Sequence, residues 1–122
     1  MGKRILLVNT IFYRLLGSHY NGNNLGIAYI ASVLNHNGHD AWIYNADFLD
    51  RDEYLKLKDI FGSFHDYTQY FKNENHPIWE EVSQKILEFN PDWVGYHCYT
   101  ANVKSIDIIS RKIRERNHNI KQ

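Results

Sequence analysis

Three short apolar runs, separated by segments with helical periodicity, are the feature that most constrains the fold of this chain. RILLVN lies at residues 4–9, AWIY at residues 41–44 and WVGYH at residues 93–97. Such runs are typical of strands buried on both faces of a parallel sheet. The strand–helix–strand order predicts right-handed crossovers. We therefore expect an α/β fold with a doubly wound parallel sheet, Rossmann- or flavodoxin-like, with strand order 2-1-3.

The segments between the strands carry helix signals at their ends. Asn24 is a suitable N-cap, and Gly38 is a suitable stop for the helix between them. Pro77 favours the first turn of a second helix, which should end before Asn90. Apolar residues at helical spacing predict three buried faces. They comprise Ile27, Ile30, Ala31 and Leu34; Trp79, Val82, Ile86 and Phe89; and Val103, Ile106, Ile109 and Ile113.

An aromatic stretch separates the second strand from the second helix. We place this insert at about residues 48–76 and expect it to be helical in parts, since Tyr54, Leu57, Phe61 and Phe64 recur at spacings of three and four. We interpret it as local core rather than as a cofactor-binding box. After the last helix the pattern calls for a fourth strand. We therefore expect residues 1–122 to be the first part of one domain, truncated before strand 4.

Charge and composition exclude several classes of partner. The chain carries 14 basic and 14 acidic residues, so it lacks the basic excess that general nucleic-acid binding requires. No apolar run approaches the roughly 20 residues of a membrane-spanning helix, and we expect no signal peptide. Cys98 is the sole cysteine. We expect a cytoplasmic protein that binds neither nucleic acid nor membrane.

The loops that follow the strands are the places to look for a site, because ligands of doubly wound sheets bind beyond the carboxyl ends of the strands. The first loop is longer than an ordinary connection of about 2–6 residues, which favours a function. It offers Phe12 and Tyr13 as flat surfaces, His19 as a polar group and Gly17 for close backbone approach. A surface loop with turn glycines remains an equal alternative.

The third loop, HCYTAN, offers a second group of candidates. Thr100 or Asn102 can cap the last helix, and backbone amides there can hold a polar ligand group. Gly95 indicates close approach by another group. We favour structural roles for the two other reactive side chains, a satisfied histidine at His97 and a small buried residue at Cys98.

Common nucleotide and phosphate motifs are absent. The chain has no GxGxxG after its first strand and no Walker lysine motif. Where a phosphoryl-receiver domain would carry acidic residues, this chain has Asn9 and His97.

With its loops placed, the chain resembles the N-terminal cobalamin-binding-type domain of radical S-adenosylmethionine enzymes, in the style of the anaerobic magnesium-protoporphyrin IX monomethyl ester cyclase. The resemblance spans nearly the whole chain. It rests on the order and spacing of RILLVN, NLGIAYIASVLNHNGHDAWIYNAD and FNPDWVGYHCYTANVKSIDIISRKIRERN.

The resemblance implies a cofactor and a partner. The cofactor is cobalamin, bound weakly by this chain alone, and the partner is a downstream radical domain that carries the 4Fe-4S cluster and S-adenosylmethionine. The parent enzyme would catalyse methyl transfer or ring formation, whereas this chain alone would not be catalytic. The implied contacts are Phe12, Tyr13, Gly17, His19, Tyr99, Thr100, Ala101 and Asn102, with Thr100 near the nucleotide tail.

The chain departs from the best-known cobalamin domains in one respect. These carry DxHxxG after the first strand, and its histidine ligates cobalt, but the motif is missing here. The metal ligand is therefore unassigned, with His19 as the candidate. The alternative function is a cofactor-free interaction or dimerisation module. In that case an unpaired edge of the third strand favours a homo-oligomer.

Overall fold

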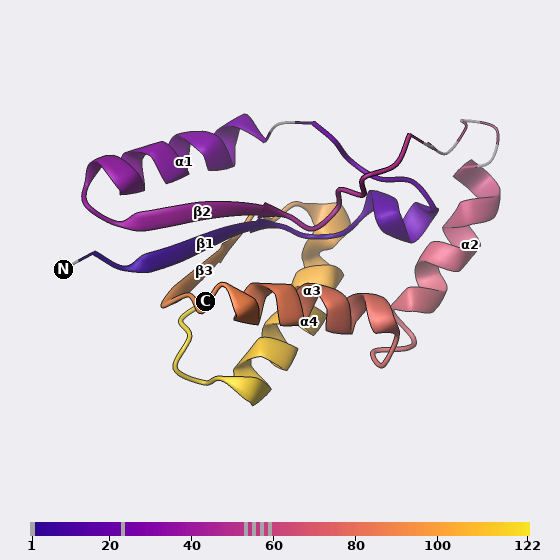
Figure 1. The fold of residues 1–122 in the computed structure, drawn as a ribbon. Coiled ribbons are helices and arrows are strands. Elements are labelled where there is room, and N and C mark those ends of the chain that lie inside the picture. Colours follow the sequence, from indigo (N-terminus) through magenta and orange to yellow (C-terminus); the bar gives the residue numbers. More distant parts are fainter. Residues whose placement is uncertain (1, 23, 53, 55, 57, 59) are drawn as a thin grey trace.

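A computed structural model shows a three-stranded parallel sheet with helices on both faces (Figure 1). It describes residues 2–22, 24–52, 54, 56, 58 and 60–122. The elements in chain order are β1 (Arg4–Asn9), η1 (Tyr13–Leu16), α1 (Leu25–His36), β2 (Asp40–Asn45), α2 (Ile60–Tyr70), α3 (Pro77–Glu88), β3 (Trp93–Tyr96), η3 (Thr100–Asn102) and α4 (Val103–Arg116).

The strand order is β2-β1-β3, and both pairings are parallel, as the sequence predicts. β1 is the central strand: Leu7 pairs with Ile43 of β2 and with Gly95 of β3. A Cβ at Gly95 would lie 2.9 Å from a terminal methyl of Leu7, so a larger residue there would require the Leu7 side chain to shift. This confirms the expected close approach at Gly95.

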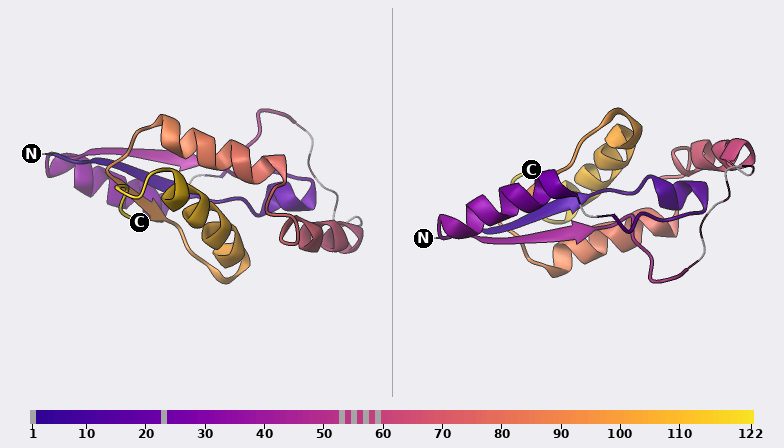
Figure 2. Two further views of the ribbon diagram at one scale, coloured as in Figure 1. Left: turned by 90° about the horizontal axis from the view of Figure 1, so that it is seen from below. Right: turned by 90° about the horizontal axis from the view of Figure 1, so that it is seen from above.

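Two cores of unequal size lie on the two faces of the sheet. α3 and α4 cover one face (Figure 2, left), where Leu6 and Val8 pack against a large buried cluster that includes Trp79, Ile86 and Ile109. α1 lies alone over the other face (Figure 2, right). Among the described residues, the buried members of the cluster there are Leu7, Ile27, Ala31 and Ala41.

The helix boundaries follow the capping signals. Asn24 accepts a hydrogen bond from the Ile27 N–H, Gly38 adopts a φ of 81° after α1, and Pro77 is the first residue of α3. Two predicted apolar faces need correction. Ile30 is 54% exposed and Val103 is 49% exposed, because the helices turn Ile27 and Ala31, and Ser105 and Ile108, toward the sheet.

The aromatic insert forms α2 at the end of the sheet to which the strands point (Figure 1). Leu57 of the predicted periodic row lies outside the described residues, and so does the side chain of Phe61. Tyr67 packs edge-on against Phe12, and its hydroxyl donates a 3.0 Å hydrogen bond to the Ala101 carbonyl. The insert therefore supports both loops in which a site was expected.

The last residues of the chain lie beside the outer edge of β3. Lys121 forms a parallel bridge with Trp93, through hydrogen bonds from Val94 N–H to Lys121 O and from Lys121 N–H to Asp92 O. This is the position expected for a fourth strand, and it covers part of the edge that we expected to be unpaired. No helix in the described part of the chain is long and apolar enough to cross a lipid bilayer.

Candidate functional site

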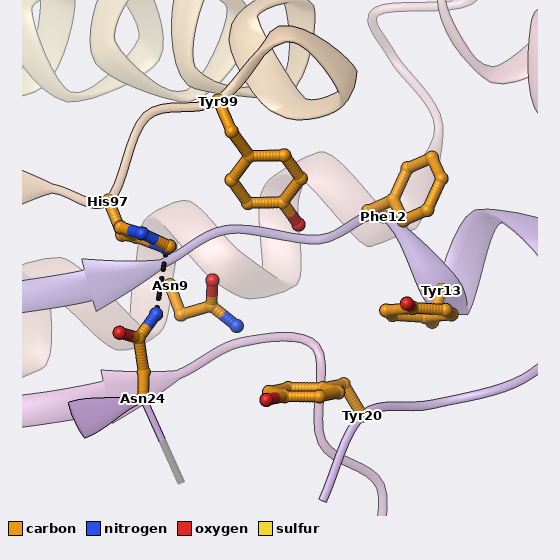
Figure 3. Close-up of a pocket in the computed structure, with 7 residues that line it drawn as sticks. All are labelled: Asn9, Phe12, Tyr13, Tyr20, Asn24, His97 and Tyr99. Atoms are coloured by element: carbon orange, nitrogen blue, oxygen red, sulfur yellow. Dashed lines mark hydrogen bonds between the residues drawn. The ribbon is translucent and has the colours of Figure 1, made fainter. Parts of the chain in front are cut away.

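A pocket of about 220 Å3 opens where the carboxyl ends of β1 and β3 lie side by side (Figure 3). From β1 the chain continues to β2 on one side of β1, and it later returns to form β3 on the other side. The pocket therefore lies at the switch point of the sheet, where α/β folds bind ligands. Its lining residues are Asn9, Phe12, Tyr13, Tyr20, Asn24, His97 and Tyr99.

Four aromatic rings form most of the pocket wall. Phe12 meets Tyr13 at 73° and Tyr99 at 80°, with ring centroids 5.1 and 6.4 Å apart. Tyr13 and Tyr20 lie nearly parallel at 15°, with centroids 5.7 Å apart. None of the described lining residues carries a formal charge at neutral pH when histidine is counted as neutral. Such a wall suits a flat, uncharged ring system.

Asp47 holds the first loop in the conformation that builds this wall. Its carboxylate is fully buried and accepts hydrogen bonds of 2.9–3.0 Å from the backbone N–H groups of Phe12, Tyr13 and Arg14. Burial raises the pKa of Asp47, and the three N–H groups and the Arg14 guanidinium oppose that rise. The three bonds fix the direction in which Phe12 and Tyr13 leave the backbone.

Arg14 ties the same turn to neighbouring elements. Its guanidinium donates to the Ala46 carbonyl at 3.0 Å and pairs with Glu81 of α3, also at 3.0 Å. The turn ends at Gly17, whose φ of 79° is left-handed. Gly17 therefore ends η1 and does not line the pocket, contrary to its expected role in close approach to a ligand.

One side of the pocket is closed by a hydrogen bond between the start of α1 and the end of β3. Asn24 Nδ2 lies 2.7 Å from His97 Nδ1, while Asn24 Oδ1 accepts from the Ile27 N–H. A backbone N–H only donates, so the amide nitrogen must face the histidine. His97 Nδ1 is then the acceptor of this hydrogen bond. One ring nitrogen of His97 therefore has a hydrogen-bond partner, in line with the structural role favoured from the sequence.

Asn102 holds the loop that carries Tyr99. Its Oδ1 accepts from the Tyr99 N–H at 2.9 Å and its Nδ2 donates to the His97 carbonyl at 2.8 Å. Asn102 is the N-cap residue of α4, one of the two candidates that the sequence offered, although its side chain makes no cap hydrogen bond. Burial, followed by the charge of Asp47, raises the pKa of Tyr99 to about 12, which keeps the phenol protonated at neutral pH.

The remaining predicted residues of the third loop lie elsewhere. Thr100 and Ala101 line a separate hollow of about 350 Å3, together with Tyr67, Lys72 and Lys104 among others. Of the eight predicted contacts, the structure therefore brings Phe12, Tyr13 and Tyr99 together in one pocket. Cys98 is exposed rather than buried, since it stands in the loop between His97 and Tyr99.

His19 is buried away from the pocket lining. Its side chain is 4% exposed, stacks on Tyr54 at 4.4 Å and meets Phe48 edge-on. Among the residues that the structure describes, neither of its ring nitrogens finds a hydrogen-bond partner. Within the described residues no group of three or more histidine, cysteine, aspartate or glutamate side chains could hold a metal ion. His97, and not His19, is therefore the histidine that lines the pocket.

The sequence analysis did not identify four of the lining residues as ligand contacts: Asn9, Tyr20, Asn24 and His97. Asn9 and His97 directly end or follow the first and third apolar runs, so their positions alone could have indicated them. Tyr20 could not have been found in this way, because its place depends on the backbone bond from Tyr20 N–H to Asp47 O.

Comparisons with known proteins leave the family of this chain open. The chain matches no protein-family model, and searches of curated proteins and of solved structures returned no match.

Proposed function

We propose that this chain is a cobalamin-binding module of a larger radical S-adenosylmethionine enzyme, and that the pocket between β1 and β3 receives one end of the cofactor. The observation that carries the proposal is the pocket itself. It lies at the switch point of the sheet and is built from both loops for which the sequence resemblance implies cofactor contacts.

The size of the pocket determines how much of a cofactor it can hold. Its volume of about 220 Å3 is below the roughly 300–1,000 Å3 of pockets that enclose a whole small ligand. Only a ring-bearing end, such as the nucleotide tail of a cobalamin, fits inside. The corrin would lie outside, across the carboxyl ends of the strands.

The residues present fit this partial role. The faces of Tyr13 and Tyr20 offer stacking surfaces, and Asn9 and Tyr99 offer polar groups. Cobalt would supply the methyl-transfer or ring-forming chemistry, and no described residue is assigned as its ligand. The partner in this proposal is a downstream radical domain holding the 4Fe-4S cluster and S-adenosylmethionine, and the compartment is the cytoplasm.

Titration with hydroxocobalamin, followed by its absorbance, tests the proposal. We expect weak, saturable binding, since only the loops after three strands contribute contacts. Tyr99→Ala should weaken binding about tenfold, which corresponds to the loss of about 1.4 kcal/mol. Phe64→Ala is the matched control, because Phe64 is an exposed aromatic residue outside the pocket lining. No spectral change at millimolar protein, or an equal effect of both variants, contradicts the proposal.

A second candidate function, a dimerisation module, is favoured by the outer face of α1. Leu25, Tyr29, Ile30 and Val33 are 54–73% exposed, although a helix over an open sheet normally turns polar residues outward. α1 contains no Asp, Glu, Lys or Arg, so two copies can pack without charge repulsion. Its exposed Leu25, Tyr29 and Val33 form one i, i+4 ridge, which suits helix–helix packing with its own copy.

The expected affinity of this dimer is low. A helix of 12 residues is about 18 Å long, and its single face buries less than the roughly 800 Å2 per partner of a stable interface. Sedimentation at rising concentration should show a monomer–dimer equilibrium that Tyr29→Glu abolishes and Phe64→Glu leaves intact. A monomer at millimolar concentration, or an equal loss in both variants, would exclude this function.

A further inference from the structure

The orientation of one pocket amide, that of Asn9, is fixed by the surrounding backbone. Asn9 ends β1, is 4% exposed and lines the pocket. Figure 3 shows its carboxamide between the Tyr99 and Tyr20 rings, with its oxygen on the Tyr99 side. The hydrogen bonds between Asn9, Asn45 and the backbone determine which of the two polar atoms of Asn9 faces a ligand.

The first link of this chain of hydrogen bonds is Asn45, at the end of β2. Its Nδ2 donates to the Tyr20 carbonyl at 3.0 Å, and its Oδ1 accepts from the Asp47 N–H at 3.2 Å. A backbone carbonyl only accepts and a backbone N–H only donates. The amide of Asn45 therefore has one allowed orientation.

The second link is Asn9 itself. Its nearest partner is the Oδ1 of Asn45, at 3.0 Å, and this oxygen can only accept. Asn9 must therefore turn its Nδ2 toward Asn45. Its Oδ1 is left without a hydrogen bond in the described part of the chain, on a residue that lines the pocket.

From this geometry we infer that the pocket selects a flat, uncharged heterocycle that carries an N–H donor at its edge, and that Asn9 is the residue that sets this preference. The inference rests on the proposal that the pocket holds the ring-bearing end of a ligand. Since the dimethylbenzimidazole tail of hydroxocobalamin carries no N–H donor, hydroxocobalamin should bind more weakly than a corrinoid whose tail carries one. A ring without a donor leaves the Asn9 oxygen dehydrated and unpaired, which costs binding free energy. A ring with a donor satisfies it, while the faces of Tyr13 and Tyr20 accept either ring.

Charge selectivity follows from the same wall. The seven lining residues that the structure describes include no carboxylate, lysine or arginine, and the nearby Asp47 carboxylate accepts hydrogen bonds from three backbone N–H groups. A charged ring would lose its hydration without gaining a counter-charge.

Three nucleosides test the inference: adenosine, with an exocyclic amino group; inosine, with a ring N–H; and purine riboside, which lacks both donors. Dissociation constants are measured from backbone NMR shifts of the whole chain. We expect adenosine or inosine to bind about tenfold more tightly than purine riboside. Equal binding of all three, or no binding by any of them, overturns the inference.

Two variants test whether Asn9 sets this preference. Asn9→Leu keeps the size of the side chain but removes the acceptor, so it should bind all three nucleosides alike. Asn9→Ala also removes the acceptor, without adding bulk, and should likewise bind all three nucleosides alike, so it replaces Asn9→Leu if that variant fails to fold. A preference that persists in either folded variant contradicts the assignment.

Hydroxocobalamin binding is read separately by absorbance. Nucleoside discrimination without hydroxocobalamin binding would reject the cobalamin proposal alone. Hydroxocobalamin binding without discrimination would reject the role of Asn9 alone.

Discussion

Asn24 and His97 meet at 2.7 Å through Nδ2 and Nδ1, and this bond joins the first residue before α1 to the first residue after β3. α1 covers one face of the sheet, whereas β3 is one of its strands (Figure 2). The pocket lies between the loop that precedes α1 and the loop that follows β3. The bond therefore couples the stability of α1 to the shape of the pocket.

Replacing Asn24 should lower the stability of α1 and disturb the shape of the pocket. Asn24→Ala removes the N-cap bond to the Ile27 N–H and the bond to His97, and we expect a loss of about 1–2 kcal/mol in the free energy of unfolding. Chemical denaturation measures it. Ser32→Ala, at an exposed position in the same helix, is the control and should change stability by less than about 0.5 kcal/mol. Similar losses in both variants would refute the coupling.

Asp47 should be the most sensitive polar position of the first loop. Asp47→Ala leaves three backbone N–H groups without their acceptor, so we expect a loss of about 2–4 kcal/mol in unfolding free energy. Asp47→Asn retains one acceptor oxygen and should fall between this variant and wild type. Asp50→Ala, at an exposed position three residues along, should be near neutral. An unchanged stability of Asp47→Ala would show that the three bonds do not hold the loop.

Gly95 and Leu7 should show coupled effects. A Cβ at Gly95 would lie 2.9 Å from Leu7 Cδ2, so Gly95→Ala should lower the unfolding free energy by about 1–3 kcal/mol. Combining it with Leu7→Ala makes room for the new methyl, and the double variant should lose less than the sum of the single losses. Strict additivity in a double-mutant cycle would refute the contact.

The buried tyrosines should make the fold sensitive to alkali. Burial, followed by the charge of Glu81, raises the pKa of Tyr44 to about 12, and burial raises the pKa of Tyr96 as well. Since the phenol of an unfolded chain has a pKa near 10, this contribution to stability is complete below about pH 10. It is lost as pH rises through the folded-state pKa.

Denaturation between about pH 9 and pH 12 measures this loss. Tyr44→Phe should flatten the decline. The Phe89 ring lies 6.3 Å from that of Tyr44 and carries no ionisable group. Phe89→Leu should therefore shift stability equally at all pH values. An identical alkaline decline in Tyr44→Phe and wild type would count against the buried phenol.

The sheet was predictable from sequence because its signals are local. The apolar run at residues 4–9 matches β1 residue for residue. Asn24 caps α1, Gly38 follows its end with a positive φ, and Pro77 begins α3, all as expected. Helix faces were less certain, since a 3.6-residue period leaves flanking positions such as Ile30 and Val103 that only tertiary packing decides.

The site was predictable only in part, for the same physical reason. Phe12, Tyr13 and Tyr99 follow strand ends and were found from that position alone. The orientation of Asn9 depends on Asn45, which is 36 residues away, and no local pattern encodes such a bond. His19 carries the chemistry of a ligand, but long-range stacking on Tyr54 buries it.

The most direct test of the central claim is a backbone NMR titration of this chain with hydroxocobalamin. If the pocket between β1 and β3 receives one end of the cofactor, the largest saturable shifts should fall on Asn9, Tyr13, Tyr20 and Tyr99, and Tyr99→Ala should weaken them about tenfold. The absence of shifts at millimolar cofactor, or shifts confined to the outer face of α1, would contradict the claim.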